Sequence, residues 1–457
     1  MTNDHRSEPY IDVGARQFPD TLHICTYDLR GTVLRTGQSK RCRQTGLVTH
    51  THQLLAGFAR AYPNLRLVIS QTGAQDNAGD LVRTPEGQTV LVQGIQTSFP
   101  DFLRIGGMKC PQRVWHYYES SIDDPDNPVY RSLANQYATA IRRAGTPHLL
   151  AQNINPLVSI LKADEFGLLG DLEPVHVTGV VHDTADMRRR LDYVRRRLSQ
   201  GPATIVLIAV SEAVRRYLLD DVGIASENVR TIRNGIDGGG FCRRIEQARH
   251  DGAFERVRAR NDLPTEGRML LTSARRVAWK GHLDILHVVK LLIARGRRDF
   301  YVVFNGAGLV DTRDKGYEKH LAQTIADLGL GRAVFLLDEL TDAELAGCYG
   351  QAHAAVHPSR LPEPFGYANI EAMLAGVPVI TTAHGGPLEY IKHGISGLLV
   401  PPSDPPALAT AIDVLLSDPQ LHARLAVGGR ASADRFGLNA MFCGYEAAIR
   451  VHLTEQH

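Results

Sequence analysis

The chain has 457 residues, 43% of them hydrophobic and 22% charged, which is ample for a folded core and indicates two or three domains. A formal net charge of only +2 implies no general affinity for nucleic acid or for a membrane surface. The six cysteines include no C-x-x-C pair, which excludes a zinc or disulfide framework, and no apolar run reaches the roughly 18 residues of a membrane helix.

The first half of the chain is predicted to alternate strands and helices. Leu22–Thr26 indicates a first strand, and Gly46–Ala61 indicates a helix whose apolar residues share one face. Ser211 follows a later strand and is a typical N-cap residue for another helix. The remaining predicted strands of this half are Leu65–Ser70, His148–Gln152, Val175–Val181 and Ile205–Val210.

Two stretches interrupt this alternation. Ala74–Asp126 is less regular, is predicted to hold insertions, and contains the aromatic run Trp115–Tyr118. Gly238–Gly240 is a run of three glycines before a polar helical pattern, and it predicts a link between domains. We therefore expect an N-terminal domain over residues 1–240 and a C-terminal domain over residues 241–457.

The second half restarts the alternation. Met269–Ser273 indicates a strand, and Leu283–Ala294 indicates a helix that ends before Gly296. Strands that alternate with helices form parallel sheets covered by helices, so two such units predict two Rossmann-like domains facing a cleft. The further predicted elements are Phe300–Phe304, Tyr317–Leu328, Val334–Leu337, Leu340–Tyr349, Ala354–Pro358, Ala368–Ala375, Val377–Thr381 and Leu398–Val400.

Two glutamates, Glu363 and Glu371, stand eight positions apart in this half. A helix that begins near Gly366 would place Glu371 on its first or second turn and Glu363 in the preceding loop. The N-terminus of a helix offers free N–H groups and a positive dipole that suit a diphosphate, and ionised carboxylates accept hydrogen bonds from sugar hydroxyls. The stretch therefore predicts a nucleotide-sugar site. The alternative is a helix with one capping and one exposed glutamate.

The residues around these glutamates resemble a known signature. Ser359–Gly366 followed by Ile370–Ile380 is similar to the signature of family 4 retaining glycosyltransferases, which have the GT-B fold. The resemblance is close from about Gly179 to Val400 and weak in the first 150 residues. It implies an α/β protein with two Rossmann-like parallel-sheet domains facing a cleft, and a C-terminal helix at about 438–457 that packs back on the N-terminal domain. The further matching segments are Ile208–Glu212, Ile232–Asp237, Ser273–Gly281, Gly385–Glu389 and Gly397–Val400.

The resemblance assigns roles around the donor phosphates and sugar. Arg275 and Lys280 match the family's two phosphate-binding cations, which would stabilise the charge that grows on the departing diphosphate. Glu363 would hold a hydroxyl of the donor sugar, with support from the backbone N–H groups of Phe365 and Gly366.

Other matched residues lie on the nucleotide side and in the first half of the chain. Glu371 would bind the ribose hydroxyls, and Leu340 belongs to the loop that contacts the base. His182 matches the family's histidine near the sugar, where a neutral imidazole could orient donor or acceptor. Gly46 matches the second glycine of a loop that approaches the phosphates, whereas Thr45 replaces the first.

Other motifs compete with these assignments. Asp124–Asp126 is formally an Asp-x-Asp metal motif, but it lies among turn-forming residues and is interpreted as a turn. Gly306–Gly308 is a weak dinucleotide signal, because it lacks a third glycine at the required spacing. Arg276 competes with Arg275 for the phosphates, and an ordinary basic loop is the structural alternative.

These observations predict a retaining glycosyltransferase that moves a sugar from a nucleotide-diphosphate sugar to a small soluble acceptor. No metal or other cofactor is expected, and the resemblance implies front-face attack in which the departing phosphate accepts the acceptor's proton. The sequence does not distinguish between a UDP sugar and a GDP sugar as the donor. Acceptor residues are expected in the first half, notably in Arg35–Arg43 and Trp115–Tyr118.

The arginine-rich composition is typical of an actinobacterial source. Similar enzymes there glycosylate inositol phosphate in thiol biosynthesis, or aminocyclitols and other scaffolds in antibiotic pathways, and we favour specialised metabolism. The polar start of the chain lacks the apolar region of a signal peptide, so we expect a cytoplasmic protein, with a homodimer left open. Two rival functions remain: a nucleotide-sugar epimerase of the same fold, and a non-catalytic nucleotide-sugar-binding subunit.

Overall fold

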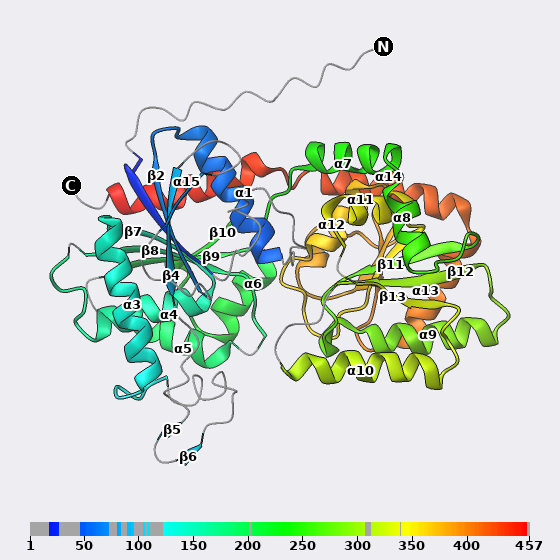
Figure 1. The fold of residues 1–457 in the computed structure, drawn as a ribbon, viewed down its shortest axis with the longest axis horizontal. Helices are drawn as coiled ribbons and strands as arrows, with labels where there is room; N and C mark the ends of the chain where they lie inside the picture. The colour runs from blue at the N-terminus through cyan, green and yellow to red at the C-terminus, as the bar shows by residue number, and fades with distance from the viewer. Residues whose placement is uncertain are drawn as a thin grey trace, which may run out of the picture.

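The computed structural model describes residues 18–26, 46–72, 80–83, 89–95, 104–105, 108–109, 122–172, 174–185, 187–200, 203–306, 312–338 and 340–454. These residues form two α/β units that lie side by side, each built on its own sheet (Figure 1). The segments Arg35–Arg43 and Trp115–Tyr118, predicted to contact the acceptor, lie outside the described residues.

The sheet of the first unit has eight strands in the order β10-β9-β8-β7-β1-β2-β4-β3, and only β3 runs antiparallel to its neighbour. Its strands are β1 (Thr21–Thr26), β2 (Arg66–Thr72), β3 (Asp80–Arg83), β4 (Thr89–Ile95), β7 (His148–Gln152), β8 (His176–Val181), β9 (Thr204–Ala209) and β10 (Val229–Thr231). Its helices include α1 (Gly46–Ala61), α3 (Pro128–Ala144), α4 (Ile154–Glu165), α5 (Arg188–Arg197) and α6 (Glu212–Arg216). A separate pair of short strands, β5 (Arg104–Ile105) and β6 (Met108–Lys109), is antiparallel.

Local sequence signals explain several of these boundaries. Helix α1 has the predicted bounds, and Leu54 and Phe58 on its apolar face are fully buried. Ser211 caps α6 as predicted, because its side chain accepts a hydrogen bond from the backbone of Val214. The Asp124–Asp126 segment is a turn, in which the Asp126 N–H donates to the Asp124 carboxylate at 2.9 Å.

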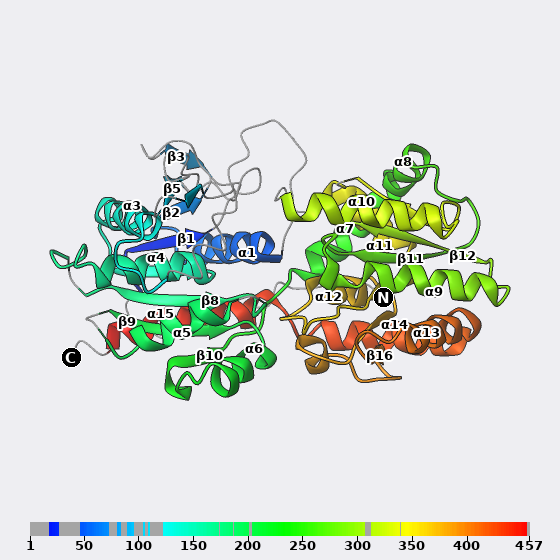
Figure 2. The same ribbon diagram turned by 90° about the horizontal axis from the view of Figure 1, so that it is seen from below.

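The sheet of the second unit has six parallel strands in the order β13-β12-β11-β14-β15-β16. Helices cover both faces, with α10 on one side and α13 and α14 on the other (Figure 2). The strands are β11 (Arg268–Ser273), β12 (Phe300–Asn305), β13 (Val334–Leu336), β14 (Ala354–His357), β15 (Val379–Thr382) and β16 (Leu398–Val400). The helices are α7 (Gly238–His250), α8 (Ala253–Arg260), α9 (His282–Ala294), α10 (Thr312–Asp327), α11 (Asp342–Gln351), α12 (Tyr367–Leu374), α13 (Pro405–Ser417) and α14 (Pro419–Ala433). Two parallel-sheet, Rossmann-like units confirm the predicted fold class.

The chain crosses between the units at two adjacent places. Ile236 bridges Gly437, and its N–H donates to the carbonyl of Phe436 at 2.8 Å. Helix α15 (Leu438–Thr454) then returns to the first unit, where the Phe442 ring packs edge-on against Phe58 at 5.0 Å. The predicted return of the C-terminal helix is therefore confirmed.

The glycine run that predicted a link has a different structure. Gly238–Gly240 forms the first turn of α7, because the Asp237 side chain accepts a hydrogen bond from the Gly240 N–H at 2.8 Å and caps the helix. The glycines therefore begin the helix instead of preceding it, and the link and the domain boundary at residue 240 stay predictions. Among the described residues, no helix combines the length and apolarity needed to cross a membrane.

Candidate active site

The loop after β11 carries the predicted phosphate-binding cations. It leaves the carboxyl end of a central strand, the edge of a parallel sheet at which ligands bind in open α/β folds. The short 3-10 helix η4 (Ala278–Lys280) then leads into Gly281 and α9. Gly281 has a φ of 76°, and a Cβ there would lie 2.1 Å from the carbonyl oxygen of Pro358. This close approach brings Lys280 beside the segment that holds Glu363.

Lys280 and Glu363 form a partly buried ion pair. The Lys280 Nζ lies 2.5 Å from the Glu363 Oε2, and each side chain is 15% exposed. The hydroxyl of Ser359 donates to the same carboxylate oxygen at 3.0 Å. Burial alone would raise the pKa of Glu363, but the charge and hydrogen bond of Lys280 outweigh it and lower the pKa. Glu363 is therefore ionised at neutral pH and can accept further hydrogen bonds through its other oxygen.

Helix α12 starts where the sequence predicts. Gly366 precedes its first residue with a φ of 90°, and no side chain caps the helix N-terminus. Glu371 lies on the second turn, where its Oε2 accepts a hydrogen bond from the Tyr349 hydroxyl at 2.9 Å. Burial raises the pKa of Glu371, and the Tyr349 hydrogen bond opposes this only in part. Neither Glu363 nor Glu371 is exposed or caps the helix. The alternative of a helix with one capping and one exposed glutamate is therefore not what the structure shows.

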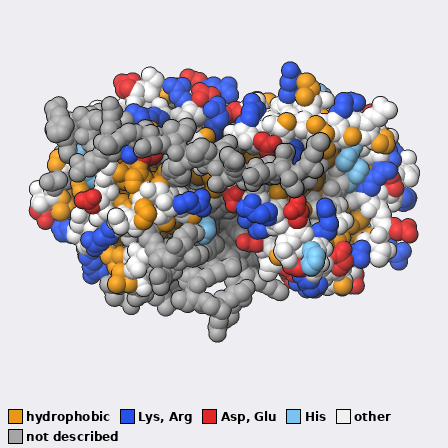
Figure 3. Space-filling view, turned by 90° about the horizontal axis from the view of Figure 1, so that it is seen from above, with side chains coloured by type: hydrophobic (Ala, Val, Ile, Leu, Met, Phe, Trp, Pro, Cys, Tyr) orange, Lys and Arg blue, Asp and Glu red, His pale blue; other side chains and the backbone are white. Residues whose placement is uncertain are grey.

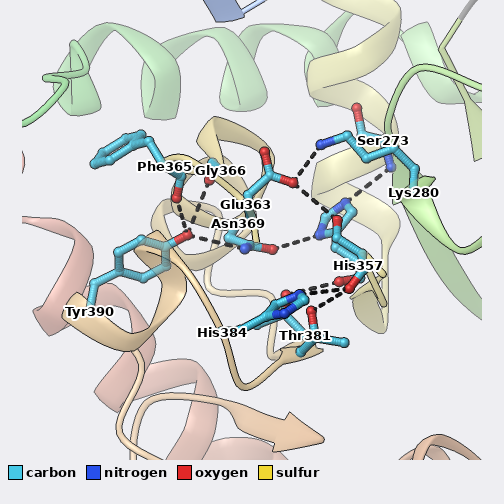
Figure 4. A network of polar contacts seen from close by, with 12 residues as sticks. Ser273, Lys280, His357, Glu363, Phe365, Gly366, Asn369, Thr381, His384 and Tyr390 are labelled. Atoms are coloured by element: carbon cyan, nitrogen blue, oxygen red, sulfur yellow. Dashed lines mark hydrogen bonds and ion pairs between the residues drawn. The ribbon is translucent and has the colours of Figure 1, made fainter. Parts of the chain in front are cut away.

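A network of polar side chains behind Glu363 fixes its loop (Figure 4). The Ser273 N–H donates to the His357 Nε2 at 3.2 Å, so the Nδ1 of that ring carries the proton and donates to the Asn369 Oδ1 at 2.7 Å. Asn369 in turn donates to the Tyr390 hydroxyl at 3.1 Å, and this hydroxyl donates to the Phe365 carbonyl at 2.6 Å. Burial lowers the pKa of His357 to about 4, which agrees with a neutral ring.

These supporting residues were not predicted from the sequence. Asn369 lies between the two matched stretches, Ser359–Gly366 and Ile370–Ile380, and His357 lies just ahead of the first, so their positions were a usable signal. Their partner Tyr390 directly follows the matched segment Gly385–Glu389. The network joins β11, β14, α12 and the segment after β15. These connections hold the two glutamates at the carboxyl edge of the sheet.

The two adjacent arginines have different environments. Arg276 is buried and donates to the Glu318 carboxylate and to the Leu337 carbonyl, both at 2.7 Å. Arg275 is half-buried, and its side chain makes no hydrogen bond or ion pair within the described part of the chain. Of the two candidates, Arg275 is thus the one whose guanidinium remains available to a ligand.

The first unit contributes His182 at the carboxyl end of β8. Its Nε2 lies 2.9 Å from the Gln152 Oε1, an acceptor, so Nε2 carries the proton and Nδ1 can accept. Burial lowers the pKa of His182 to about 3, and the imidazole is therefore neutral as predicted. The His50 ring of α1 packs edge-on against it, with ring centroids 4.5 Å apart.

Asp183 follows His182 and faces the second unit. Burial raises the pKa of its carboxylate, the charge of Arg275 opposes this, and the charge of Glu363 adds to it. Asp183 therefore lies within electrostatic reach of both residues, and the end of β8 faces the loops of the second sheet across the space between the units. Figure 3 shows a hollow between the units, with charged side chains at its rim. Asp183 was not predicted as a site residue, although it adjoins His182.

The two remaining predicted site residues, Gly46 and Leu340, lie at the starts of helices. Gly46 is the first residue of α1. Leu340 is only 8% exposed and precedes Thr341, which caps α11 through a reciprocal capping box with Glu344. The Leu340 side chain thus has little surface left for a base, whereas its neighbours Asp338 and Thr341 are exposed.

The arrangement suits an anionic ligand that also carries hydroxyl groups. Lys280, Arg275 and the uncapped start of α12 supply positive charge and N–H donors, while Glu363 and Glu371 supply acceptors. Because Lys280 keeps Glu363 ionised, Glu363 cannot serve as the general acid of a glycosidase pair at neutral pH. The part of the chain that the structure describes contains no group of three or more His, Cys, Asp or Glu side chains placed to hold a metal ion.

Residues 253–432 match the model of a protein family described as "Glycosyl transferases group 1", so this part of the chain is a glycosyltransferase group 1 domain. A D-inositol 3-phosphate glycosyltransferase of Frankia alni is 33% identical over 252 residues, which cover 54% of this chain and 59% of that protein. One from Thermobispora bispora is 32% identical over 204 residues, covering 43% of this chain and 47% of that protein. The chain thus spans about half the length of the curated relatives it matches.

Solved structures resemble nearly the whole chain. Sucrose-phosphate synthase from Thermosynechococcus elongatus superposes with a TM-score of 0.70 at 19% identity, covering 95% of this chain and 100% of that chain. Anabaena HepE in complex with UDP and glucose gives a TM-score of 0.64 at 18% identity, covering 95% of this chain and 99% of that chain. At such low identity these similarities establish the GT-B fold alone.

Proposed function

We propose that this protein is a family 4 retaining glycosyltransferase that transfers a sugar from a nucleotide-diphosphate sugar to a small soluble acceptor. The observation that carries the proposal is the Lys280–Glu363 ion pair beside the uncapped start of α12, at the carboxyl edge of the second sheet. This arrangement combines cationic and N–H donors for a diphosphate with an ionised acceptor for sugar hydroxyls.

The proposed phosphate site consists of Lys280 and Arg275. An ammonium group has three donors, and Glu363 accepts one of those of Lys280, so the others remain for phosphate oxygens. The negative charge on the diphosphate grows as the sugar–phosphate bond breaks, and fixed cations lower the barrier because they act most strongly on that developing charge. No metal is needed in this scheme.

The proposed sugar and acceptor site lies between the two units. Glu363 accepts a hydrogen bond from a sugar hydroxyl, and His182 accepts one through its unprotonated Nδ1. Phe365 and Gly366 offer backbone N–H groups, Glu371 binds the ribose, and the segments at Leu340 and Gly46 contact the base and the phosphates. The acceptor attacks from the face that the phosphate leaves, and that phosphate takes the acceptor's proton, so the configuration is retained.

We infer a phosphorylated or amino-substituted cyclitol as the first acceptor class to test. Two relatives are named D-inositol 3-phosphate glycosyltransferases, and their similarity supports this choice. In the same proposal the protein acts in the cytoplasm, in specialised-metabolite or thiol biosynthesis, with domains at residues 1–240 and 241–457.

A donor and acceptor screen tests the proposed function. UDP and GDP sugars would be ranked by thermal shift, and each stabilising donor would then be incubated with a panel of cyclitol acceptors and analysed by mass spectrometry. We expect an acceptor whose mass increases by one sugar residue, in the presence of EDTA as well as in its absence. A change of the donor sugar without any acceptor would indicate the epimerase alternative, and stabilisation by a donor without any turnover would indicate a binding subunit.

A further inference from the structure

Glu389 joins the two units at a point outside the reacting groups. It ends the 3-10 helix η5 (Gly386–Glu389), which belongs to the second unit. Its Oε1 accepts a hydrogen bond from the Ala213 N–H at 3.1 Å, and its Oε2 accepts one from the Arg233 Nε at 2.7 Å. Ala213 lies in the first turn of α6 and Arg233 follows β10, so both donors come from the first unit.

Both contacts suit a carboxylate. The Ser211 side chain already accepts from Val214 at the start of α6, whereas the N–H of Ala213 has no partner within the helix and is available to Glu389. The Arg233–Glu389 contact is a charge-assisted hydrogen bond whose carboxylate side chain is only 13% exposed. One side chain thus connects two separate segments of the first unit to η5.

The residues on either side of Glu389 contact the loop that holds Glu363. The Gly386 N–H donates to the carbonyl oxygen of Glu363 at 2.7 Å. A Cβ at Gly385 would lie 2.4 Å from the same oxygen, so the two backbones pack together without a side chain between them. On the other side, Tyr390 donates to the Phe365 carbonyl within the network behind the site (Figure 4).

Arg233 also lies close to the crossing between the units. The chain crosses at Ile236, only three residues further on, where it bridges Gly437. The hydroxyl of Tyr367, the first residue of α12, donates to the Gly235 carbonyl at 3.2 Å. The segment from Arg233 to Ile236 is therefore tied to the second unit both at η5 and at the start of α12.

We infer that Glu389 is a positioning residue, whose contacts with Ala213 and Arg233 set the angle between the units and hold the Glu363 loop facing His182. This inference rests on the proposed function and deepens it, because the donor sugar is to be held by Glu363 from one unit and by His182 from the other. Loss of the contact leaves the phosphate-binding cations in place but lets the two sides of the sugar site separate.

The test compares two matched arginine variants. Arg233→Gln removes the guanidinium charge that pairs with the Glu389 carboxylate across the boundary between the units. Arg260→Gln is the control, because Arg260 makes an ion pair of the same 2.7 Å length with Glu344 inside the second unit, at a similar exposure of 40% against 49%. For both variants, small-angle X-ray scattering with and without UDP reports the separation of the units, and steady-state kinetics gives kcat and the donor KM.

We expect Arg233→Gln to increase the separation of the units and to lower kcat by roughly 10-fold or more, because small misplacements of reacting groups are costly, while the donor KM changes little. Arg260→Gln should match the wild type in both measurements. Glu389→Gln, which keeps an acceptor oxygen for Ala213, should give the same pattern as Arg233→Gln. The inference is overturned if both variants at the Arg233–Glu389 contact behave like Arg260→Gln. Scattering does not depend on turnover, so an unchanged separation of the units in both variants refutes the inference even if the enzyme accepts none of the donors tested. Failure of the wild-type protein to transfer sugar refutes the proposed function alone.

Discussion

Lys280 contacts Glu363 directly, and at the scale of single residues the proposed site is built on this contact. The sequence predicted both residues by resemblance, as a phosphate ligand and a sugar ligand, but not that they would touch. Such a contact depends on the approach of Gly281 to Pro358, which joins two loops that are far apart in the chain. Spacing in sequence cannot report a distance of that kind.

The first prediction concerns Lys280. In Lys280→Ala we expect kcat to fall by about 10² or more, because one fixed donor to the developing phosphate charge is lost, while donor affinity falls less. Lys290→Ala is a suitable control, because Lys290 is exposed on α9 and donates only to the Leu328 carbonyl among the described residues. Near wild-type turnover by Lys280→Ala would mean that the phosphate assignment is wrong.

The second prediction uses the opposite pKa shifts of the two glutamates. Burial raises the pKa of Glu371, so its carboxylate takes up a proton at a higher pH than an ordinary glutamate. Binding of UDP, measured by calorimetry, should therefore weaken as the pH is lowered toward that raised pKa. Glu371→Gln should bind UDP more weakly at neutral pH and lose this pH dependence, whereas Glu363→Gln should retain it. A wild-type affinity that does not vary with pH would exclude Glu371 from the nucleotide site.

At the scale of elements, α12 shows what could be predicted and what could not. Its start near Gly366 followed from glycine ahead of an apolar run, and the structure confirms it. Helix α10 begins at Thr312 instead of the predicted Tyr317, because its first residues are polar and carry no apolar periodicity. The polar network behind Glu363 was missed altogether, since hydrogen bonds among buried side chains leave no periodic pattern.

The third prediction tests how α12 is held. Gly366 has a φ of 90°, and a Cβ there would lie 2.8 Å from the Tyr390 hydroxyl and 3.2 Å from the Glu363 side chain. Gly376 also has a positive φ, 72°, but has nothing within 4 Å of such a Cβ, so Gly376→Ala measures the backbone strain alone. Gly366→Ala should therefore lower both Tm and donor affinity more than Gly376→Ala does. Equal effects of the two substitutions would show that packing against Tyr390 does not position Glu363.

At the scale of the whole molecule, buried histidines make the stability depend on pH. Burial lowers the pKa of His23, His182 and His282 from 6.5 to about 3. Two arginines of α5 are partly internal as well: Arg190 is only 7% exposed, and Arg197 pairs with Asp164 at 2.7 Å. Composition predicted a folded core but could not predict how many polar groups lie inside it.

The fourth prediction follows from those histidines. Each stays neutral in the folded protein down to a pH of about 3 but binds a proton below 6.5 in the unfolded chain. The unfolded state therefore binds more protons in this window, and the free energy of unfolding falls as the pH is lowered, by at most about 1.4 kcal/mol per pH unit for each histidine. Thermal unfolding at about pH 7.5 and about pH 5 measures this loss. His282→Phe, whose ring would replace an imidazole packed edge-on against Phe304, should reduce the loss, and an unchanged slope would contradict the assignment.

Retention of configuration is the central claim about the molecule, because it requires the two units to hold the sugar while the phosphate leaves and the acceptor enters on one face. The most direct test is proton NMR of the product formed from a gluco-configured donor with an α-linked nucleotide, recorded during the reaction so that later equilibration is detected. The proposed mechanism predicts a new anomeric signal with the small coupling of an α-linked product. A signal with the large coupling of a β-linked product would mean that a base deprotonates the acceptor behind the anomeric carbon, and would contradict the roles proposed here for Glu363 and His182.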